Sequence, residues 1–146
     1  MKILIINGPN LNMLEHREPG IYGTKSMEQV LYELQRQRPD VYIQYRQSNH
    51  EGDIIDWLQE TVNDNDNDNV DGIILNAGGY THTSVAIRDA VALCSVPVVE
   101  VHISNIYARE PFRQVSLLTD VCAHTIIGHG TDGYAEAVAW ILKENL

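Results

Sequence analysis

Five short apolar runs alternate with helix-like segments along most of the chain, and this alternation limits the possible folds more than any other feature. The run at 2–7 (KILIIN) ends at Gly-Pro and is typical of a strand covered on both faces. The run at 41–47 (VYIQYRQ) alternates between apolar and polar residues, which suits a strand at a sheet edge. Further strands are predicted at 70–76, 96–102 and 124–128.

The segments between these runs carry apolar residues at spacings of three and four, which is the pattern of an amphipathic helix. Ser26 and Thr83 are the expected N-caps of two of these helices. Strands that alternate with helices form an α/β domain with a parallel sheet. The edge-like second strand favours a flavodoxin-like three-layer sandwich with the strand order 2-1-3-4-5, although the alternation by itself leaves other orders open. The predicted helices span 26–37, 52–62, 83–94 and 132–145.

Length and charge narrow the class of protein. A chain of 146 residues fits one domain, 1–146, around one core. The net charge of −10 argues against nucleic acid as a partner, because phosphate backbones require a basic face. No apolar stretch approaches the ~18 residues of a membrane span, and none resembles a signal peptide, so we expect a cytoplasmic protein without membrane contact. Cys94 and Cys122 lie in apolar runs and are expected to be buried reduced thiols.

Metal and nucleotide signatures are weak in this sequence. The stretch NDNDNDN at 63–69 lacks the glycine and the distal glutamate of an EF-hand, so we interpret it as a solvated turn. His50, His82 and His102 do not have the spacing of zinc ligands. The turn after Asn76 does not match the dinucleotide fingerprint. We therefore expect neither a metal nor a cofactor.

The polar residues of the predicted sheet gather where its strands end, which is the edge at which parallel α/β sheets bind ligands. Glu100 and His102 lie two apart on one strand and therefore project from the same face. A carboxylate orients an imidazole and favours its protonated form, which suits a general acid. A histidine that is merely hydrogen-bonded at a strand end would give the same pattern.

Two further features of this edge suit an anionic ligand. The backbone amides of Ile103 and Ser104 follow the fourth strand and could receive a carboxylate. His82 lies in THTS, at the start of a predicted helix whose free amides attract anions.

Residues 8–24 follow the first strand and read as neither strand nor helix, yet they exceed the ~12 to 15 residues of an ordinary connection. We predict that they form an active-site lid, with a mobile surface loop as the alternative. Ionising Tyr22 at neutral pH would cost about 4 kcal/mol. A guanidinium at ~4 Å would return about the same. Arg17 can supply it, and Arg109 or Arg113 from AREPFR can add a second, unless these arginines only hold the loop.

Six segments stand out together: INGPNLNML, REPGIYG, RQSNHEGDIIDWLQ, LNAGGYTHTSVAIRDA, VEVHISNIYAREPFR and the GY before the last helix. In this order, and over nearly the whole chain, they resemble type II 3-dehydroquinate dehydratases. The resemblance implies a flavodoxin-like fold assembled into trimers and then a homododecamer. It also implies the loss of water from 3-dehydroquinate to give 3-dehydroshikimate, in the shikimate pathway of aromatic amino acid biosynthesis or in quinate breakdown. No metal, nicotinamide or Schiff-base lysine is implied.

The resemblance also implies a role for each matching residue. The substrate is a β-hydroxy ketone that carries a carboxylate, so elimination needs a base beside the ketone and an acid for the departing hydroxyl. Tyr22 matches the base, and Arg17 matches the residue that favours its ionised form. His102 matches the acid, with Glu100 orienting it. Asn10 matches the residue that stabilises the enolate through water. The expected binding residues are Asn76, His82, Ile103, Ser104, Arg109 and Arg113, with Asp89 reaching a neighbouring subunit's site.

Several positions depart from the family pattern. Glu15 stands where glycine is common and adds a carboxylate that could compete for Arg17, which would affect the lid and turnover. The other departures are Gln114, Val115, His124 and His129. Two other functions stay open: a flavin- or phosphate-binding module on the same fold, and an inactive homologue that serves as a scaffold.

Overall fold

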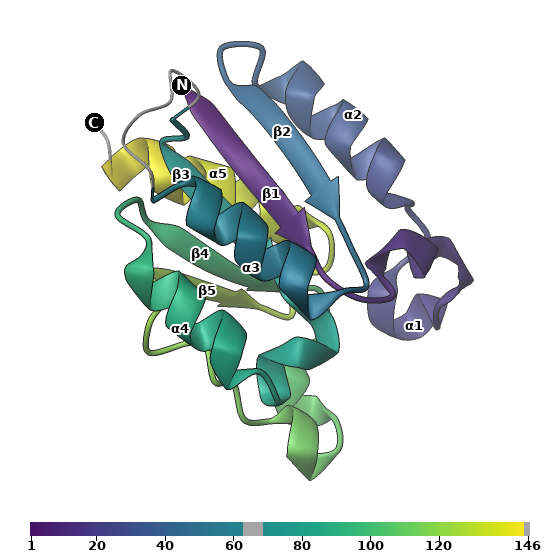
Figure 1. Ribbon diagram of the computed structural model, residues 1–146. Helices are drawn as coiled ribbons and strands as arrows, with labels where there is room; N and C mark the ends of the chain where they lie inside the picture. The colour runs from purple at the N-terminus through teal and green to yellow at the C-terminus, as the bar shows by residue number, and fades with distance from the viewer. Residues whose placement is uncertain (63–68, 145–146) are drawn as a thin grey trace.

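The computed structural model, which describes residues 1–62 and 69–144, contains a five-stranded parallel sheet in the order β2-β1-β3-β4-β5 (Figure 1). This confirms the predicted fold and strand order. The solvated turn predicted at 63–69 lies, except for its last residue, outside the described residues. The strands are β1 (Lys2–Asn7), β2 (Tyr42–Gln47), β3 (Gly72–Asn76), β4 (Val98–His102) and β5 (His124–Ile127).

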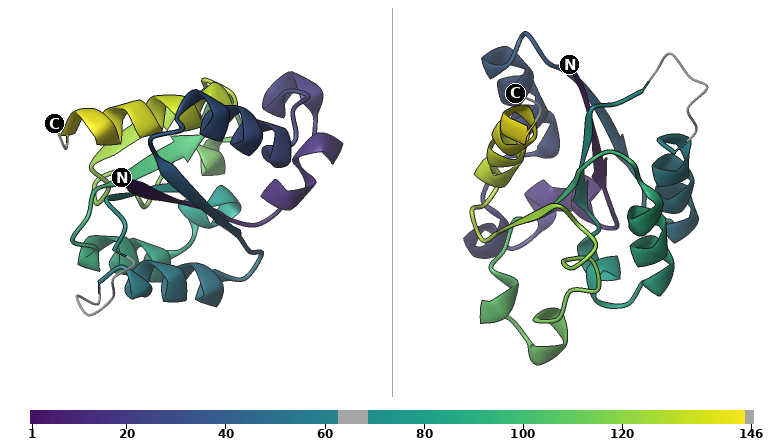
Figure 2. Two further views of the ribbon diagram at one scale, coloured as in Figure 1. Left: turned by 90° about the horizontal axis from the view of Figure 1, so that it is seen from above. Right: turned by 90° about the vertical axis from the view of Figure 1, so that its left-hand side faces the viewer.

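Four longer helices cover the two faces of the sheet, so the domain has three layers (Figure 2). Helices α2 and α5 lie on one face, and α3 and α4 lie on the other. Within the described residues, no helix is both long enough and apolar enough to cross a membrane. The bounds are α2 (Met27–Gln37), α3 (Glu51–Glu60), α4 (Val85–Leu93) and α5 (Asp132–Glu144).

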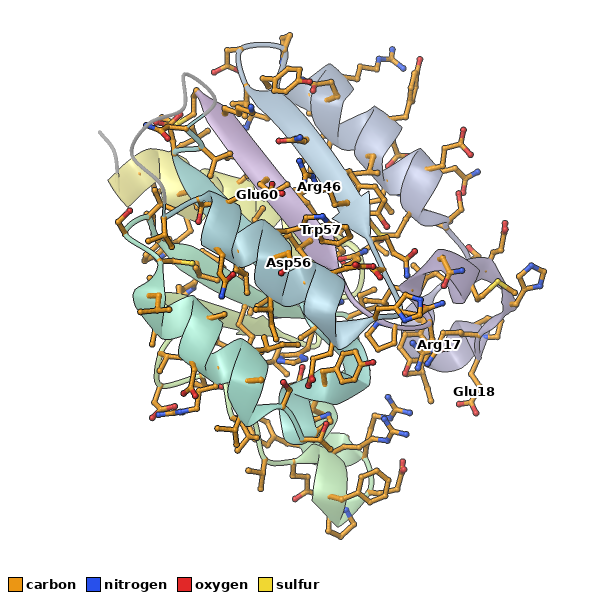
Figure 3. All side chains as sticks on the ribbon, viewed as in Figure 1. Arg17, Glu18, Arg46, Asp56, Trp57 and Glu60 are labelled. Atoms are coloured by element: carbon orange, nitrogen blue, oxygen red, sulfur yellow. The ribbon has the colours of Figure 1, made fainter. Side chains whose placement is uncertain are left out.

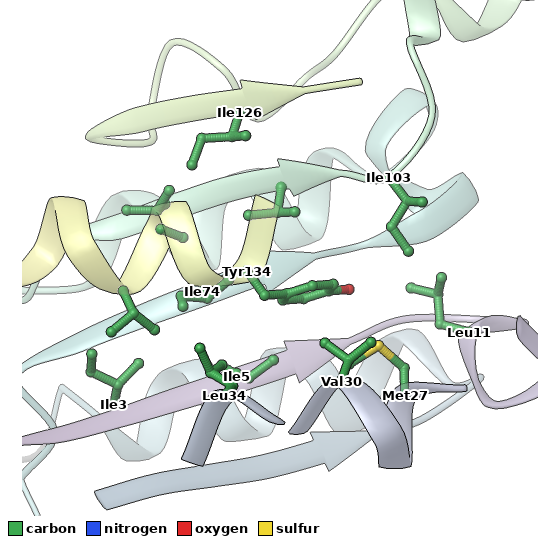
Figure 4. Close-up of a cluster of buried hydrophobic side chains, with 14 of the residues drawn as sticks. Ile3, Ile5, Leu11, Met27, Val30, Leu34, Ile74, Ile103, Ile126 and Tyr134 are labelled. Atoms are coloured by element: carbon green, nitrogen blue, oxygen red, sulfur yellow. The ribbon is translucent and has the colours of Figure 1, made fainter. Parts of the chain in front are cut away.

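The alternation of side chains along β1 divides the core into two clusters. Ile3 and Ile5 pack toward α2 and α5, in the cluster shown in Figure 4, whereas Leu4 and Ile6 pack toward α3 and α4. All four side chains are buried, as the continuously apolar run predicted. Strand β2 has the predicted edge character, since it pairs with β1 alone and its Tyr42 is exposed.

One predicted N-cap is confirmed and the other is wrong. Ser26 forms a capping box with Gln29 at the start of α2. Helix α4 is capped by Ser84, whose hydroxyl accepts from the amide of Ile87 at 2.9 Å, and not by Thr83. The difference arises because the 3-10 turn η2 (Gly78–His82) occupies the preceding residues, and the amide of Thr83 bonds back to that turn. Helix α4 therefore begins later than its apolar spacing suggested.

Residues 8–24 are more regular than predicted. They contain the 3-10 segment η1 (Leu11–His16) and the single helical turn α1 (Pro19–Tyr22). Proline at the first position of a helix loses no hydrogen bond and already has a helical φ, which explains how α1 begins directly after an extended residue. Leu11 and Leu14 are buried in the core and anchor the segment. The segment is thus fixed at its first part and carries Tyr22 at its last helical residue.

A close approach of two strand-end loops shapes the carboxyl edge of the sheet. A Cβ at Gly8 would lie 2.5 Å from the carbonyl oxygen of Ala77, so only glycine fits there. The amide of Gly8 donates to the carbonyl of Asn76 at 2.7 Å. Gly78 has a φ of +59°, a left-handed conformation that also favours glycine. These contacts hold the loops after β1 and β3 against each other.

Candidate active site

A cavity lies beyond the carboxyl ends of β3 and β4, at the edge where polar residues were predicted to gather. Residues of the 8–24 segment also line it, so this segment and the sheet share its walls. Figure 3 shows Arg17 beside α1 at this end of the molecule, with Glu18 directed away from the body of the domain. The lining residues are Leu11, Arg17, Tyr22, Asn76, Gly78, His82, His102, Ile103, Ser104, Ile106 and Arg109.

Two guanidinium groups converge on the hydroxyl of Tyr22. Arg17 donates to this oxygen at 2.5 Å, and Arg109 donates to it at 2.6 Å from the loop after β4. The Cζ atom of Arg17 also lies 3.8 Å from the centre of the tyrosine ring. Tyr22 is itself buried, so its hydroxyl meets both guanidinium groups away from bulk water.

Glu100 and His102 form a buried pair on β4, as their spacing predicted. The Nε2 atom of His102 lies 2.5 Å from Oε2 of Glu100. The glutamate is 1% exposed and the histidine 5% exposed. His102 lines the cavity, and within the described residues its Nδ1 has no protein partner. A ring held this way can offer a proton to a bound ligand.

Three hydroxyl groups complete the environment of the Glu100 carboxylate. Ser116 donates to Oε2 at 2.6 Å, and Thr119 and Thr125 donate to Oε1 at 2.7 and 3.0 Å. Burial acts to raise the pKa of Glu100, but the bonds from His102, Ser116 and Thr119 outweigh it and hold this pKa below its ordinary value. The carboxylate is therefore ionised at neutral pH and holds the ring of His102 in place through its bond to Nε2.

Asn76 and His82 reach the cavity with one end of each side chain already bonded. Asn76 accepts from the amide of Gly78 at 3.2 Å and donates to the hydroxyl of Tyr134 at 3.1 Å. The Nδ1 of His82 lies 2.7 Å from the carbonyl oxygen of Val115, which requires the proton on Nδ1. Both side chains are oriented before a ligand arrives. Within residues 1–62 and 69–144, no three His, Cys, Asp or Glu side chains are placed to hold a metal.

Eight of the twelve predicted site residues line the cavity, and Glu100 stands behind one of them. The other three lie outside it in this chain. Asn10 is exposed, with a φ of +69°, and its amide donates to Asn49 at 3.1 Å. Asp89 is exposed on α4, and Arg113 pairs with Glu110 at 2.9 Å.

Four residues with roles around the site were not predicted. Ser116 and Thr119 escaped notice because they lie in a loop without periodicity, and Thr125 because its pairing with Glu100 depends on the register between β4 and β5. A glutamate within an apolar strand was the available signal, because a buried carboxylate requires donors. Tyr134 belongs to the GY that carried part of the resemblance, but no role was assigned to it.

The positions that depart from the family pattern have ordinary contacts. Glu15 lies 3.9 Å from His16 and both are exposed, while Arg17 bonds Tyr22. The side chain of Gln114 donates to the carbonyl of Arg109 at 2.9 Å and so supports that loop. Further along the chain, His124 stacks on Trp140, and His129 lies 2.5 Å from Glu136. Val115 is exposed.

The family model described as dehydroquinase class II matches residues 1–142 of this chain. The chain belongs to this family. A protein named 3-dehydroquinate dehydratase from Campylobacter jejuni subsp. jejuni is 52% identical over 145 residues, which cover 98% of this chain and 88% of that protein. A protein of the same name from Exiguobacterium sp. is 51% identical over 144 residues, covering 98% and 95% of the two chains.

Solved structures of class II dehydroquinases share the whole fold. The type II dehydroquinase from Butyrivibrio crossotus superposes with a TM-score of 0.90 at 44% identity, covering 97% of each chain. The type II dehydroquinase from Propionibacterium acnes has a TM-score of 0.89 at 34% identity, covering 97% of this chain and 96% of that one. The family resemblance found in the sequence is therefore confirmed.

Proposed function

We propose that this protein is a hydro-lyase that removes water from 3-dehydroquinate to give 3-dehydroshikimate. The observation that carries the proposal is that one cavity holds both halves of the required chemistry. Tyr22 with its two arginines supplies a base, and His102 with Glu100 supplies an acid. Membership of the class II dehydroquinase family, whose curated relatives are named 3-dehydroquinate dehydratases, gives independent support.

In the proposed reaction, the Tyr22 phenolate removes a proton from the carbon beside the ketone and becomes a neutral phenol. The C–H electrons form an enolate, which the arginines and Asn10, through a water molecule, stabilise. The enolate then expels the hydroxyl group, which takes a proton from His102 and leaves as water. Moving one proton from Tyr22 to His102, through solvent, restores the starting state. Every proton is accounted for without a redox cofactor.

The remaining site residues would bind the substrate. The amides of Ile103 and Ser104 suit the carboxylate, while Asn76 and His82 suit the hydroxyl groups. Arg113 would reach the substrate if its loop, together with the lid of residues 8–24, closes over the cavity. Arg109 has two functions in this proposal, since it bonds Tyr22 and also lies 3.5 Å from the hydroxyl of Ser104.

The position of Asp89 supports the proposed assembly into trimers. This residue is exposed and outside the cavity of its own chain, so it would contribute to the site of a neighbouring subunit within a trimer. Four trimers would form the homododecamer. We further propose that the protein is cytoplasmic, that it acts in the shikimate pathway or in quinate breakdown, and that it binds neither nucleic acid nor membranes.

The reaction would proceed without a metal and without a Schiff base. The three lysines of the sequence support the second point, because Lys2 begins β1, Lys25 pairs with Glu33 at 2.8 Å and Lys143 lies near the end of α5. None of the residues that line the cavity is a lysine.

The direct test is to add 3-dehydroquinate to the purified protein and record the ultraviolet absorbance of a conjugated enone. The signal should grow in proportion to enzyme concentration and persist in the presence of a chelator. Borohydride added with substrate should leave the enzyme active. His102→Ala is the matched control and should give almost no signal. Absence of the enone at high enzyme concentration would sink the proposal.

A further inference from the structure

A chain of polar side chains crosses the otherwise apolar core directly beneath the cavity. Tyr134 stands at its centre, on α5, and is completely buried. Its hydroxyl donates to Oδ1 of Asn7 at 2.8 Å and accepts from Nδ2 of Asn76 at 3.1 Å. Asn7 in turn donates to the hydroxyl of Tyr45 at 3.4 Å. Figure 4 shows the ring of Tyr134 among apolar side chains, with its oxygen on the side of the cluster where Leu11 and Ile103 lie.

One backbone group sets the direction of every hydrogen bond in this row of polar side chains. The amide of Gly78 can only donate, so the atom of Asn76 that it meets must be the carbonyl oxygen. The nitrogen of Asn76 therefore faces Tyr134. Since this nitrogen can only donate, the single proton of Tyr134 must go to Asn7. Burial raises the pKa of Tyr134 well above its ordinary value, so the phenol keeps this proton at neutral pH.

Asn76 has one amide hydrogen left after these bonds. Its carbonyl oxygen is taken by Gly78 and one N–H by Tyr134, and the side chain lines the cavity. We propose that Tyr134 is a positioning residue that makes Asn76 present an N–H donor, and not its carbonyl, to the bound substrate. This inference rests on the proposed function, because it states which kind of group on that substrate Asn76 binds. Such a donor would bind an acceptor oxygen of the ligand.

Tyr134→Phe tests the inference by removing one oxygen while keeping the ring that fills the core. The donor of Asn76 would no longer be fixed, so KM should rise roughly tenfold, which is the usual worth of one hydrogen bond. The kcat should stay within about twofold, because a ligand contact made equally in ground and transition states changes KM alone. An unchanged KM would overturn the inference.

Tyr45→Phe is the matched control. It removes a hydroxyl from the same chain of bonds, but at the end away from Asn76, and leaves the bond between Tyr134 and Asn76 in place. Thermal unfolding of both variants should show a comparable loss of stability, while only Tyr134→Phe raises KM. An equal rise of KM in the two variants would mean that the network is merely structural, and would also overturn the inference.

A double-mutant cycle then checks that Tyr134 acts through Asn76. Asn76→Ala should raise KM by at least as much as Tyr134→Phe, and adding Tyr134→Phe to Asn76→Ala should change KM less than about twofold. If the two substitutions instead raise KM by independent factors that multiply, Tyr134 does not act through Asn76.

A measurement on the wild-type protein covers the case in which Tyr134→Phe does not fold. With asparagine labelled by ¹⁵N, one side-chain hydrogen of Asn76 should exchange slowly with solvent, and the other should shift when quinate is added. Two hydrogens that exchange equally fast would overturn the inference even without a variant. Failure of the proposed function has a different signature, namely wild-type protein that produces no enone.

Discussion

The two halves of the proposed catalytic site, an acid half and a base half, are built in opposite ways. The acid half, His102 and Glu100, lies on β4 in the interior of the sheet, and four donors fill the carboxylate. The base half, Tyr22 and Arg17, lies on and beside one helical turn in a long connection. Its second cation comes from another loop. One half is therefore part of the core, whereas the other is assembled from two loops that meet over the cavity.

The two halves therefore differ in how easily they can move. A histidine on a central strand can move only if the sheet opens, so its orientation is set during folding. The base half instead depends on contacts between loops, since Tyr22 is buried but its partners Arg17 and Arg109 come from segments outside the sheet. Loop segments open at lower free-energy cost than a central strand. We therefore propose that the base half moves with the lid when substrate enters or product departs, while the acid half stays in place. Substitutions should therefore be able to disable one half and spare the other.

Tyr22→Phe should break the base half without unfolding the protein. The ring remains to pack against Arg17, but no atom is left to accept the substrate proton. We expect kcat to fall about 10³-fold, within the usual range for loss of a general base. The free energy of unfolding should change by no more than about 1 kcal/mol. Tyr32→Phe, at an exposed position on α2, is the control and should keep full activity.

Glu100→Gln should disrupt the acid half and lower the free energy of unfolding by about 3 kcal/mol at neutral pH. It replaces a buried carboxylate that accepts from His102 and three hydroxyls with a neutral amide. The native-state pKa of Glu100 is held below its ordinary value of 4.5. Its contribution to stability is therefore complete above that value and is lost as the pH falls through the lower native pKa. Denaturant unfolding between pH 7 and pH 3 should show the wild type approaching the variant at low pH. A gap that stays constant across this range would contradict the account.

Ser116→Ala should show that the two halves are connected. Ser116 bonds Glu100 but lies on the segment that also carries Arg109, so it ties that loop to the core. Thr125→Val is the matched variant, since it removes another donor to Glu100 from within β5. Each should cost about 1 kcal/mol of stability. Only Ser116→Ala should speed hydrogen exchange over residues 106–116 and lower kcat/KM, by roughly fivefold. Equal effects of the two would show that the loop is not tethered in this way.

The reactivity of the Cys122 thiol measures whether the core around Glu100 is closed to solvent. Of the effects considered, this one concerns activity least. Burial, together with the negative charge of Glu100, raises the pKa of the Cys122 thiol to about 12. Alkylation by iodoacetamide at pH 8 should therefore run about 10³-fold slower than for an exposed cysteine. Reaction should become fast only on unfolding. Cys94, whose pKa is also raised by burial, should behave similarly. Both thiols are reduced, and half-buried where full burial was expected.

The sequence predicted the acid half better than the base half, for a physical reason. Strand periodicity fixes which side chains share a face, so Glu100 and His102 could be paired from their spacing alone. The contact between Tyr22 and Arg109 joins residues 87 positions apart through two loops, and no local pattern encodes it. Ser116 and Thr119 likewise come from a segment without periodicity, whereas Thr125 lies opposite Glu100 on β5 and depends on a strand register that spacing does not give. Thr83 was assigned as a cap because a 3-10 turn cannot be distinguished from the first turn of a helix by apolar spacing.

The central claim is that the two halves act in separate steps, with proton removal by Tyr22 preceding acid transfer from His102. Incubating each variant with 3-dehydroquinate in D₂O and following deuterium at the carbon beside the ketone by mass spectrometry tests this order directly. His102→Ala should exchange deuterium into substrate while forming almost no enone. Tyr22→Phe should do neither. Exchange by Tyr22→Phe at the wild-type rate, or no exchange by His102→Ala, would contradict the claim.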